Sequence, residues 1–226
     1  MTSQTYTGEV AVGGAAQVRT LEHLSITKVA VDQKMSNNCY LLACRDTGDQ
    51  VLIDAADVPE TLLALIDGRG LSAVITTHQH WDHHRALAAV TAEHPGAVVA
   101  GQEDAEAITE QTGVQVTVSV SDGDRVQIGD SSLEVISIPG HTPGSICLLY
   151  EDPNGHPHLF TGDSLFPGGV GATFGDSAAF AQLIDNVEAK IFARLPDETW
   201  VYPGHGTDTT LGAERPHLQE WRERGW

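Results

Sequence analysis

The segment 76–86, TTHQHWDHHRA, contains four histidines and an aspartate within seven residues, directly after the apolar run AVIT. In an extended loop, residues two apart point the same way, so His78, His80 and Asp82 can face one point. His83 is expected to begin the following helix and to face a neighbouring point. Burying so many polar groups without a metal would cost several kcal/mol. The spacing therefore predicts a metal centre that suits two adjacent cations better than one.

Two coordination spheres need more ligands than this segment supplies, and three candidates stand in short loops after other predicted strands. His141 lies in IPGHTPGS, Asp163 follows HLFTG, and His205 lies in VYPGHG after the strand TWVY. Ligand sites of α/β sheets lie at the carboxyl ends of strands. We therefore expect these three side chains to converge on the cleft that holds the histidine-rich segment.

Two further residues are expected beside the metals rather than bound to them. Asp54 ends the predicted strand QVLID and is a candidate to accept a hydrogen bond that fixes a histidine tautomer. Aspartate is also common in turns, so an ordinary turn role for Asp54 stays open. His84 lies one helical position past His83, which favours a supporting or exposed role over ligation.

The elements that must position these residues alternate along the chain. Short β-branched runs predict strands at 23–31, 38–44, 50–55, 71–77, 97–100, 115–120, 124–129, 131–139, 145–150 and 158–162. Apolar residues at helical spacing predict helices at 58–70, 82–96, 102–113 and 177–196. Turn signals at Asp122–Gly123 and Gly129–Asp130 indicate antiparallel hairpins. The chain is expected to form one α/β domain over residues 1–226, with two sheets faced by helices.

Composition narrows the classes of partner. The chain has 226 residues, and 31 acidic against 12 basic residues give a net charge of −19, which opposes binding to nucleic acid. No run approaches the roughly 18 apolar residues of a membrane span, and no secretory signal is seen at the N-terminus. Three cysteines with no finger spacing favour reduced, buried thiols. We expect a cytoplasmic protein with a small-molecule substrate and no membrane partner.

Four motifs together resemble one family. They are HxHxDH at 78–83, GHTPGS at 140–145, TGDSLF at 161–166 and PGHG at 203–206. Their order and spacing resemble the metallo-β-lactamase superfamily, and most closely its glyoxalase II (hydroxyacylglutathione hydrolase) branch of thioester hydrolases. The resemblance covers nearly the whole chain. It implies an αββα sandwich, a four-layer fold of two mixed β-sheets packed face to face with helices outside.

The resemblance also implies a ligand set and a reaction. One metal falls to His78, His80 and His141, and the other to Asp82, His83 and His205, with Asp163 bridging. The cofactors are two divalent metal ions, with zinc the default and iron or manganese as alternatives. A metal-bridging hydroxide attacks the carbonyl of a small S-acyl thiol conjugate, because metal binding lowers the pKa of water to about 7. The free oxygen of Asp82 is a candidate to orient this hydroxide, which gives Asp82 a catalytic role.

The substrate is less well defined than the ligands. Glyoxalase II enzymes carry a C-terminal helical domain that binds glutathione, whereas only about twenty residues follow His205 here. Arg215, with Arg222 and Arg224, is the nearest candidate to bind the anionic end of a substrate. The segment GGVGATFG, 168–175, lacks the third glycine of a dinucleotide loop and is expected to form the backbone of a substrate loop.

Two alternatives to hydrolysis stay open. Persulfide dioxygenases resemble glyoxalase II closely but use a single iron, held by two histidines and an aspartate. Ligand types alone do not separate the two enzymes. A noncatalytic metal-binding protein is the second alternative, although sites with open coordination positions usually mark chemistry.

Overall fold

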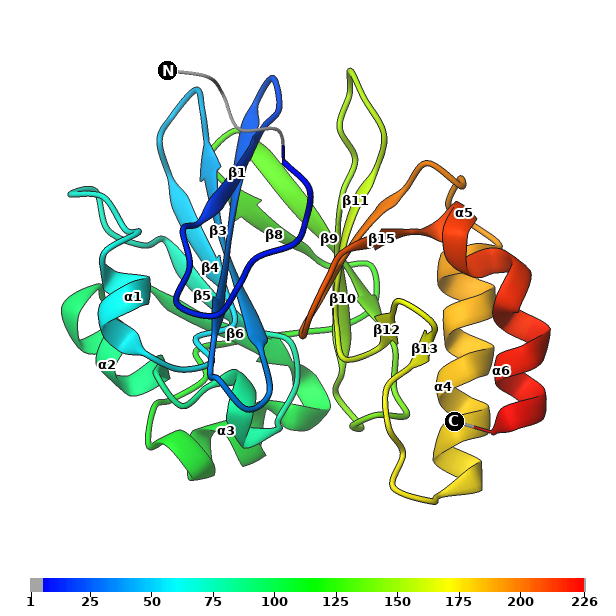
Figure 1. Ribbon diagram of the computed structural model, residues 1–226. Coiled ribbons are helices and arrows are strands. Elements are labelled where there is room, and N and C mark those ends of the chain that lie inside the picture. Colours follow the sequence, from blue (N-terminus) through cyan, green and yellow to red (C-terminus); the bar gives the residue numbers. More distant parts are fainter. Residues whose placement is uncertain (1–5, 226) are drawn as a thin grey trace.

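Two mixed β-sheets pack face to face, and helices cover the outer face of each (Figure 1). The structure is a computed structural model and describes residues 6–225. Sheet 1 follows chain order: β1 (Gln17–Thr20), β2 (Leu24–Val31), β3 (Asn37–Cys44), β4 (Gln50–Ile53), β5 (Ala73–Thr76), β6 (Ala97–Gly101) and β7 (Val118–Val120). Its strands β1 to β4 are antiparallel, and β4 to β7 are parallel. The parallel half brings the carboxyl ends of β4, β5 and β6 to one edge.

Sheet 2 has six strands in a different order. Across the sheet they are β15 (Thr209–Thr210), β14 (Trp200–Pro203), β11 (His158–Gly162), β10 (Ile146–Tyr150), β9 (Ser131–Ser137) and β8 (Arg125–Ile128). Only β11 and β14 pair in parallel, so both end at the same edge. A small hairpin of β12 (Leu165–Phe166) and β13 (Gly169–Val170) follows β11.

The helices form the two outer layers. Those over sheet 1 are α1 (Pro59–Leu63), η1 (Trp81–His83), α2 (Leu87–Glu93), η2 (Gln102–Asp104) and α3 (Ala105–Thr112). Those over sheet 2 are α4 (Ser177–Asn186), its π-helical continuation η3 (Val187–Phe192), α5 (Leu211–Glu214), η4 (Arg215–His217) and α6 (Leu218–Arg224). Trp221 of α6 lies in the same buried cluster as Leu183 of α4. The C-terminal helix is therefore part of this outer layer.

Alternation along the strands explains the layers. Val51 and Ile53 of β4 lie in the cluster between the sheets, whereas Leu52 packs against the outer helices. Successive strand residues point to opposite faces, and both faces of β4 and β5 are buried. Apolar residues can therefore run without a break along β4 and β5. The αββα fold predicted from the sequence is confirmed.

Some boundaries differ from the predictions. The helix expected over 58–70 is α1 alone, and the helix expected to begin at His83 begins at Leu87. His83 instead closes the 3₁₀ turn η1, where its N–H donates to the carbonyl of His80 at 3.0 Å. This tighter turn redirects Asp82 and His83, which an immediate α-helix would place on its own face. The last helical segment, α6, was missed because its apolar residues are too few to show a helical period.

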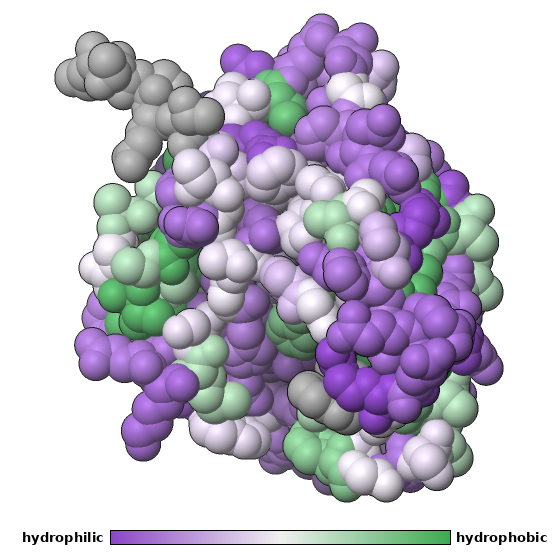
Figure 2. Space-filling model, turned by 45° about the vertical axis from the view of Figure 1, so that its right-hand side comes forward, coloured by the Kyte–Doolittle hydropathy of each residue, from purple (hydrophilic) through white to green (hydrophobic). Residues whose placement is uncertain are grey.

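The surface agrees with the acidic composition. The face shown in Figure 2 is mostly hydrophilic, with separate and smaller apolar patches. None of the helices between residues 6 and 225 has the length and apolar character that crossing a membrane requires. Cys39, Cys44 and Cys147 are buried free thiols, as the sequence predicted.

Candidate metal centre

All seven predicted ligands converge at one edge of the sandwich, in three overlapping groups. The ligand atoms of each group lie within 4.8 Å of one another, and the groups are His78–His80–His141, His78–His83–Asp163 and Asp82–His83–His205. We call the first group the three-histidine half and the last group the Asp82 half. Asp163 lies between the halves, because its carboxylate oxygens lie 3.6 Å from His141 Nε2 and 3.4 Å from His205 Nε2.

Within each half, ring nitrogens face each other at short range. His80 Nδ1 lies 2.9 Å from His141 Nε2, and His83 Nε2 lies 3.2 Å from His205 Nε2. Glycine makes this crowding possible, since a Cβ at Gly204 would lie 2.3 Å from an oxygen of Asp163. Any larger residue there would displace the carboxylate that lies between the two halves.

Outer contacts orient the rings of the three-histidine half. His141 Nδ1 lies 2.8 Å from the carbonyl oxygen of Ala172. Because a carbonyl oxygen can only accept a hydrogen bond, Nδ1 must carry the proton. Thr77 Oγ1 lies 2.9 Å from a carboxylate oxygen of Asp54, to which it can donate, and 3.1 Å from His78 Nδ1. The Nδ1 protons thus point outward and leave the Nε2 lone pairs of both rings directed at the cluster.

The Asp82 half uses the same device. His83 Nδ1 lies 2.8 Å from Asp54 Oδ2, and His205 Nδ1 lies 2.8 Å from the carbonyl oxygen of Met35. Asp54 therefore occupies the position that its predicted tautomer-fixing role requires. Hydrogen bonds of this kind are the usual support of metal-binding histidines.

Charge differs between the halves. In the three-histidine half, burial is the largest cause that lowers the pKa values of His78, His80 and His141. Because these pKa values lie below the ordinary value of about 6.5, the rings are neutral at pH 7. Neutral imidazole is the form that binds metal.

In the Asp82 half, carboxylates outweigh burial. Burial acts to lower the pKa of His83, but the charges of Asp163 and Asp54 raise it well above its ordinary value. Burial likewise opposes the shift of His205, whose contacts with Asp163 and Asp82 raise its pKa to about 9. The pKa of the Asp82 carboxyl falls, because its bond with His205 and the charge of His83 outweigh burial. Without a metal, His83 and His205 thus carry protons whose positive charge offsets the neighbouring carboxylates.

The donor set fits divalent metal ions. His78 Nε2 and Asp163 Oδ1 are buried and have no hydrogen-bond partner among the described residues, although both point into the cluster. Buried polar atoms without partners are costly and rare in folded proteins. Five imidazoles and two carboxylates suit zinc, iron or manganese. Divided between two ions, these seven donors give each ion four protein ligands only if both ions share Asp163.

Sequence reasoning missed the residues that hold the Asp82 half. Asn37 is fully buried at the start of β3, and its Nδ2 donates to Asp82 Oδ2 at 2.9 Å and to the Asp82 carbonyl at 3.1 Å. Lys28 is also fully buried; its Nζ pairs with Asp208 at 2.6 Å and donates to the carbonyl of Gly206 at 2.8 Å. A lysine inside the apolar strand 24–31 was the signal available, since buried lysines need a partner.

Asp104 was also missed, and it holds the three-histidine half. This carboxylate is fully buried at the end of η2. It accepts hydrogen bonds from the backbone N–H of Gln79 at 2.9 Å, the hydroxyl of Thr142 at 2.6 Å and the backbone N–H of Gly144 at 2.7 Å. In the sequence, Asp104 lies in a helix start where acidic residues are ordinary, so no signal distinguished it.

His84 is buried and does not join either half of the cluster. Its Nε2 lies 3.1 Å from the carbonyl oxygen of Gln79, the residue between His78 and His80. This contact closes the loop on itself. The geometry agrees with a supporting role for His84 and not with metal ligation.

Arg215, predicted to bind substrate, instead braces the outer layer of sheet 2. Its guanidinium donates to the carbonyls of Phe192 at 2.6 Å and Leu195 at 3.0 Å, and it pairs with Asp197. Arg222 similarly pairs with Asp185 and Glu188 of α4 and η3. A planar guanidinium used in this way fixes helix packing. The structure therefore does not support the predicted substrate contact at Arg215.

The glycine-rich segment 168–175 does reach the cluster. Ala172 supplies the carbonyl that orients His141, and Phe174 is 80% exposed with its ring centroid 5.8 Å from that of His80. Phe174 has a φ of 55°, a left-handed conformation that is uncommon for large residues. An exposed aromatic ring held beside metal ligands can contact a bound substrate.

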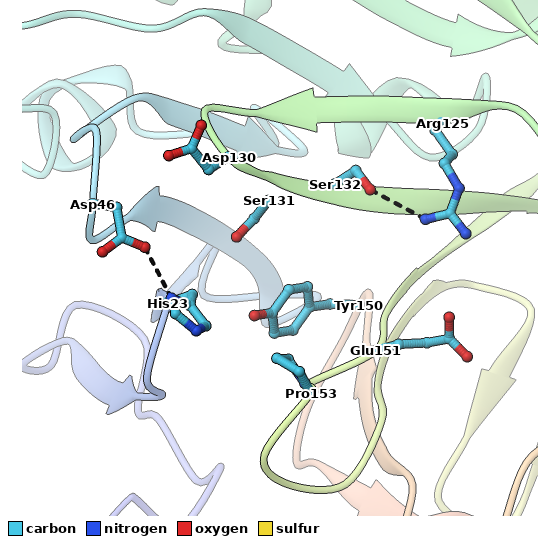
Figure 3. Close-up of a pocket in the computed structure, with 9 residues that line it drawn as sticks. All are labelled: His23, Asp46, Arg125, Asp130, Ser131, Ser132, Tyr150, Glu151 and Pro153. Atoms are coloured by element: carbon cyan, nitrogen blue, oxygen red, sulfur yellow. Dashed lines mark hydrogen bonds and ion pairs between the residues drawn. The ribbon is translucent and has the colours of Figure 1, made fainter.

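Figure 3 shows a cavity lined by residues that include His23, Arg125 and Tyr150, away from the metal cluster. Tyr150 lines this cavity and lies opposite His158 in the strand register, at the start of β11. Asp163 follows the other end of β11, so the cavity and the metal cluster lie at opposite ends of this strand. His23 pairs with Asp46 at 2.9 Å, and Arg125 donates to Ser132. The cavity contains none of the predicted ligands.

Comparison with known proteins agrees with this geometry. Residues 33–205 match the family model of the metallo-beta-lactamase superfamily. A hydroxyacylglutathione hydrolase from Thermosynechococcus vestitus is 37% identical over 81% of this chain and 72% of its own length. A protein of the same name from Hahella chejuensis is 36% identical over 75% of this chain and 62% of its own length. This chain thus spans less than two thirds of some relatives.

Among solved structures, that of TTHA1623 in a di-iron-bound form has a TM-score of 0.63 and 34% sequence identity. The alignment covers 83% of this chain and 96% of that one. The family model spans every predicted ligand, from His78 to His205, and the structure brings those ligands to one edge of an αββα sandwich. On these grounds the chain belongs to the metallo-β-lactamase superfamily.

Proposed function

We propose that the protein is a glyoxalase II-like thioesterase that binds two divalent ions, zinc by default, and hydrolyses small S-acyl thiol conjugates. The observation that carries the proposal is the position of Asp163, whose carboxylate lies within 3.6 Å of ring nitrogens from both halves of the cluster. A carboxylate between two sets of ligands can be shared by two ions. The names of the relatives support the thioester as substrate.

Bound divalent ions supply a water of lowered pKa and a Lewis acid for the carbonyl. The chain itself supplies orientation and charge. Asn37 donates to Asp82 Oδ2, which fixes the carboxylate and leaves its other oxygen to accept a hydrogen bond that orients the attacking water. The low pKa of Asp82 keeps this group ionised at pH 7. We therefore assign Asp82 both a ligand role and an orienting role.

The leaving group explains why a thioester suits this site. The cluster consists of histidines and carboxylates that are occupied once metals bind, so it offers no spare proton donor. A thiolate leaves without general-acid assistance, whereas an amine or an alkoxide does not. Phe174, exposed beside His80 and His141, provides an apolar contact for the acyl or thiol part of the substrate.

The test is a substrate panel on zinc-loaded and iron-loaded protein, with thiol release and oxygen consumption recorded together. The panel contains S-lactoylglutathione, an S-lactoyl ester of a smaller thiol, a cephalosporin, a phosphodiester and a persulfide. We expect thiol release from at least one thioester, little turnover of the lactam and phosphodiester, and none by metal-stripped protein. Faster lactam or phosphodiester turnover would refute the thioesterase. Oxygen uptake with the persulfide on iron-loaded protein would replace it with a dioxygenase.

A further inference from the structure

Asp104 forms hydrogen bonds with residues that are next in the chain to all three ligands of the three-histidine half. Gln79, which donates its N–H to Asp104 Oδ2, stands between His78 and His80 in the chain. Thr142, whose hydroxyl donates to the same oxygen, follows His141 directly. One carboxylate therefore contacts both segments that carry these histidines, although it binds none of the rings.

The two segments come from different sheets. His78 and His80 follow β5 of sheet 1, while His141 lies in the loop between β9 and β10 of sheet 2. The packing at the junction is close, since a Cβ at Gly144 would lie 2.4 Å from the backbone N of Asp104. Gly144 also donates its own N–H to Asp104 Oδ1 at 2.7 Å. The junction is thus built around this side chain.

Asp104 is an unusual choice for a purely structural contact. It is fully buried, and no lysine, arginine or histidine among residues 6–225 forms an ion pair with it. Within residues 6–225 its carboxyl group accepts from three hydrogen-bond donors, two of them main-chain N–H groups. Carboxylates accept such bonds more strongly than neutral groups do. The hydrogen bonds of Asp104 therefore hold the backbone at Gln79 and at Gly144 in fixed positions.

We propose that Asp104 is a positioning residue that sets the distance of His141 from His78 and His80, and through it the metal affinity of the three-histidine half. The inference rests on the proposed metal centre. It also predicts selectivity, because the Asp82 half is held by other residues, namely Asn37 and the Lys28–Asp208 pair. Loss of Asp104 should therefore weaken one site and spare the other.

Asp104→Asn is the direct test because it keeps the shape of the side chain. In either orientation the amide NH₂ faces a backbone N–H, that of Gly144 or that of Gln79, which then lacks an acceptor. Zinc is titrated into metal-free protein by calorimetry, and histidine ring ¹H–¹⁵N spectra show which rings bind. We expect two sites in the wild type. In the variant, affinity at His78, His80 and His141 should fall about 10–100-fold, as for other outer partners of metal ligands.

Two smaller changes keep the test decisive if Asp104→Asn does not fold. Thr142→Val removes a single donor to Asp104 and should weaken the same site to a lesser degree, whereas Thr142→Ser should restore it. In metal-free Thr142→Val, the amides of Gln79 and Gly144 should exchange hydrogen faster than in the wild type. A role confined to overall stability would not distinguish these two amides from others.

Glu214→Gln is the matched control. Glu214 is a buried carboxylate that accepts from the N–H of Gly168 at 2.8 Å and the hydroxyl of Thr209 at 2.6 Å, and it contacts none of the ligands. Equal zinc affinity in Asp104→Asn and wild type would overturn the inference, as would an equal loss in Glu214→Gln. Failure of the wild type to bind two ions would instead refute the proposed metal centre.

Discussion

The two halves of the metal centre hold the same kind of ligand by opposite means. Burial keeps the rings of the three-histidine half neutral, and Asp104 joins the two sheets that carry them. The Asp82 half lies among carboxylates, which raise the pKa values of His83 and His205. The three-histidine half is thus organised by backbone contacts, and its neutral rings can bind a cation without first losing protons. The other is organised by charge and holds protons that a cation must displace.

The largest effect should come from the residue that both halves share. Asp163→Asn removes the charge that lies within 3.6 Å of His83, His141 and His205. We expect thioester turnover to fall more than about 100-fold, beyond the loss typical of residues that only support ligands. Circular dichroism should show an unchanged fold. Asp197→Asn, which alters an exposed partner of Arg215, serves as the control, and turnover near the wild-type level in Asp163→Asn would show that the bridge is misassigned.

pH should separate the halves nearly as strongly. His205, with a pKa of about 9, must lose a proton to bind metal, so this proton alone should make the zinc affinity of the Asp82 half rise about 50-fold from pH 7 to pH 9. The three-histidine half should change little over this range, because its pKa values are lowered. Zinc titrations at several pH values measure both. Equal pH dependence of the two sites would remove the distinction between them.

The same shift has a consequence for the metal-free fold. A raised pKa of His205 stabilises the folded state fully below about pH 6.5, the ordinary value, and this contribution is lost as the pH rises through about 9. Denaturant titration of metal-free protein should therefore show falling stability over this window. Zinc-loaded protein should not show the loss, and a metal-free protein that gains stability from pH 7 to 9 would contradict the assignment.

An intermediate effect is expected at Asp54. Asp54→Asn keeps the left-handed backbone of this residue, whose φ is 56°, since asparagine tolerates that conformation. It removes the charge that orients His83 Nδ1, so zinc affinity of the Asp82 half should fall about 10–100-fold. The three-histidine half has a weaker link to Asp54, through Thr77 alone. If Asp54→Asn lowered zinc affinity only in the three-histidine half, Asp54 would support that half and not the Asp82 half.

The smallest effect is expected at His84. His84→Ala removes a contact with the carbonyl of Gln79 and leaves every ligand in place. The free energy of unfolding should fall by about 1–3 kcal/mol, because the partly buried carbonyl of Gln79 loses its partner. Turnover at saturating zinc should change only a few-fold. Collapse of metal binding would show that His84 belongs among the ligands.

The sequence identified the clustered side chains better than the residues that support them. His78, His80, Asp82 and His83 form a dense local pattern, and a local pattern can be read without knowing the fold. Lys28, Asn37 and Asp104 act across long sequence separations, such as the 38 residues between Asp104 and Thr142. Lys28 had a local signal, its place inside the apolar strand 24–31, whereas nothing in the neighbours of Asn37 and Asp104 along the chain distinguishes them. Such contacts appear only once the two sheets are packed.

Secondary structure shows the same division. The ten strand predictions succeeded because β-branched runs end at turn residues, as β4 does before Asp54. The turn η1 was mistaken for the start of a helix, since the polar residues Asp82 and His83 fit either. Arg215 follows His205 closely in sequence, but proximity in sequence does not specify direction in space. Its guanidinium bonds to Phe192 and Leu195 were beyond any local pattern.

The most direct test of the two-ion account is the rate of thioester hydrolysis as zinc is added stepwise to metal-free protein. The two halves differ in charge, Asp163 lies between them, and the proposed mechanism uses both. We therefore predict little activity below one zinc per chain, a steep rise up to two, and a plateau there, with elemental analysis confirming two ions. Full activity at one ion per chain, with no second ion bound, would contradict the account.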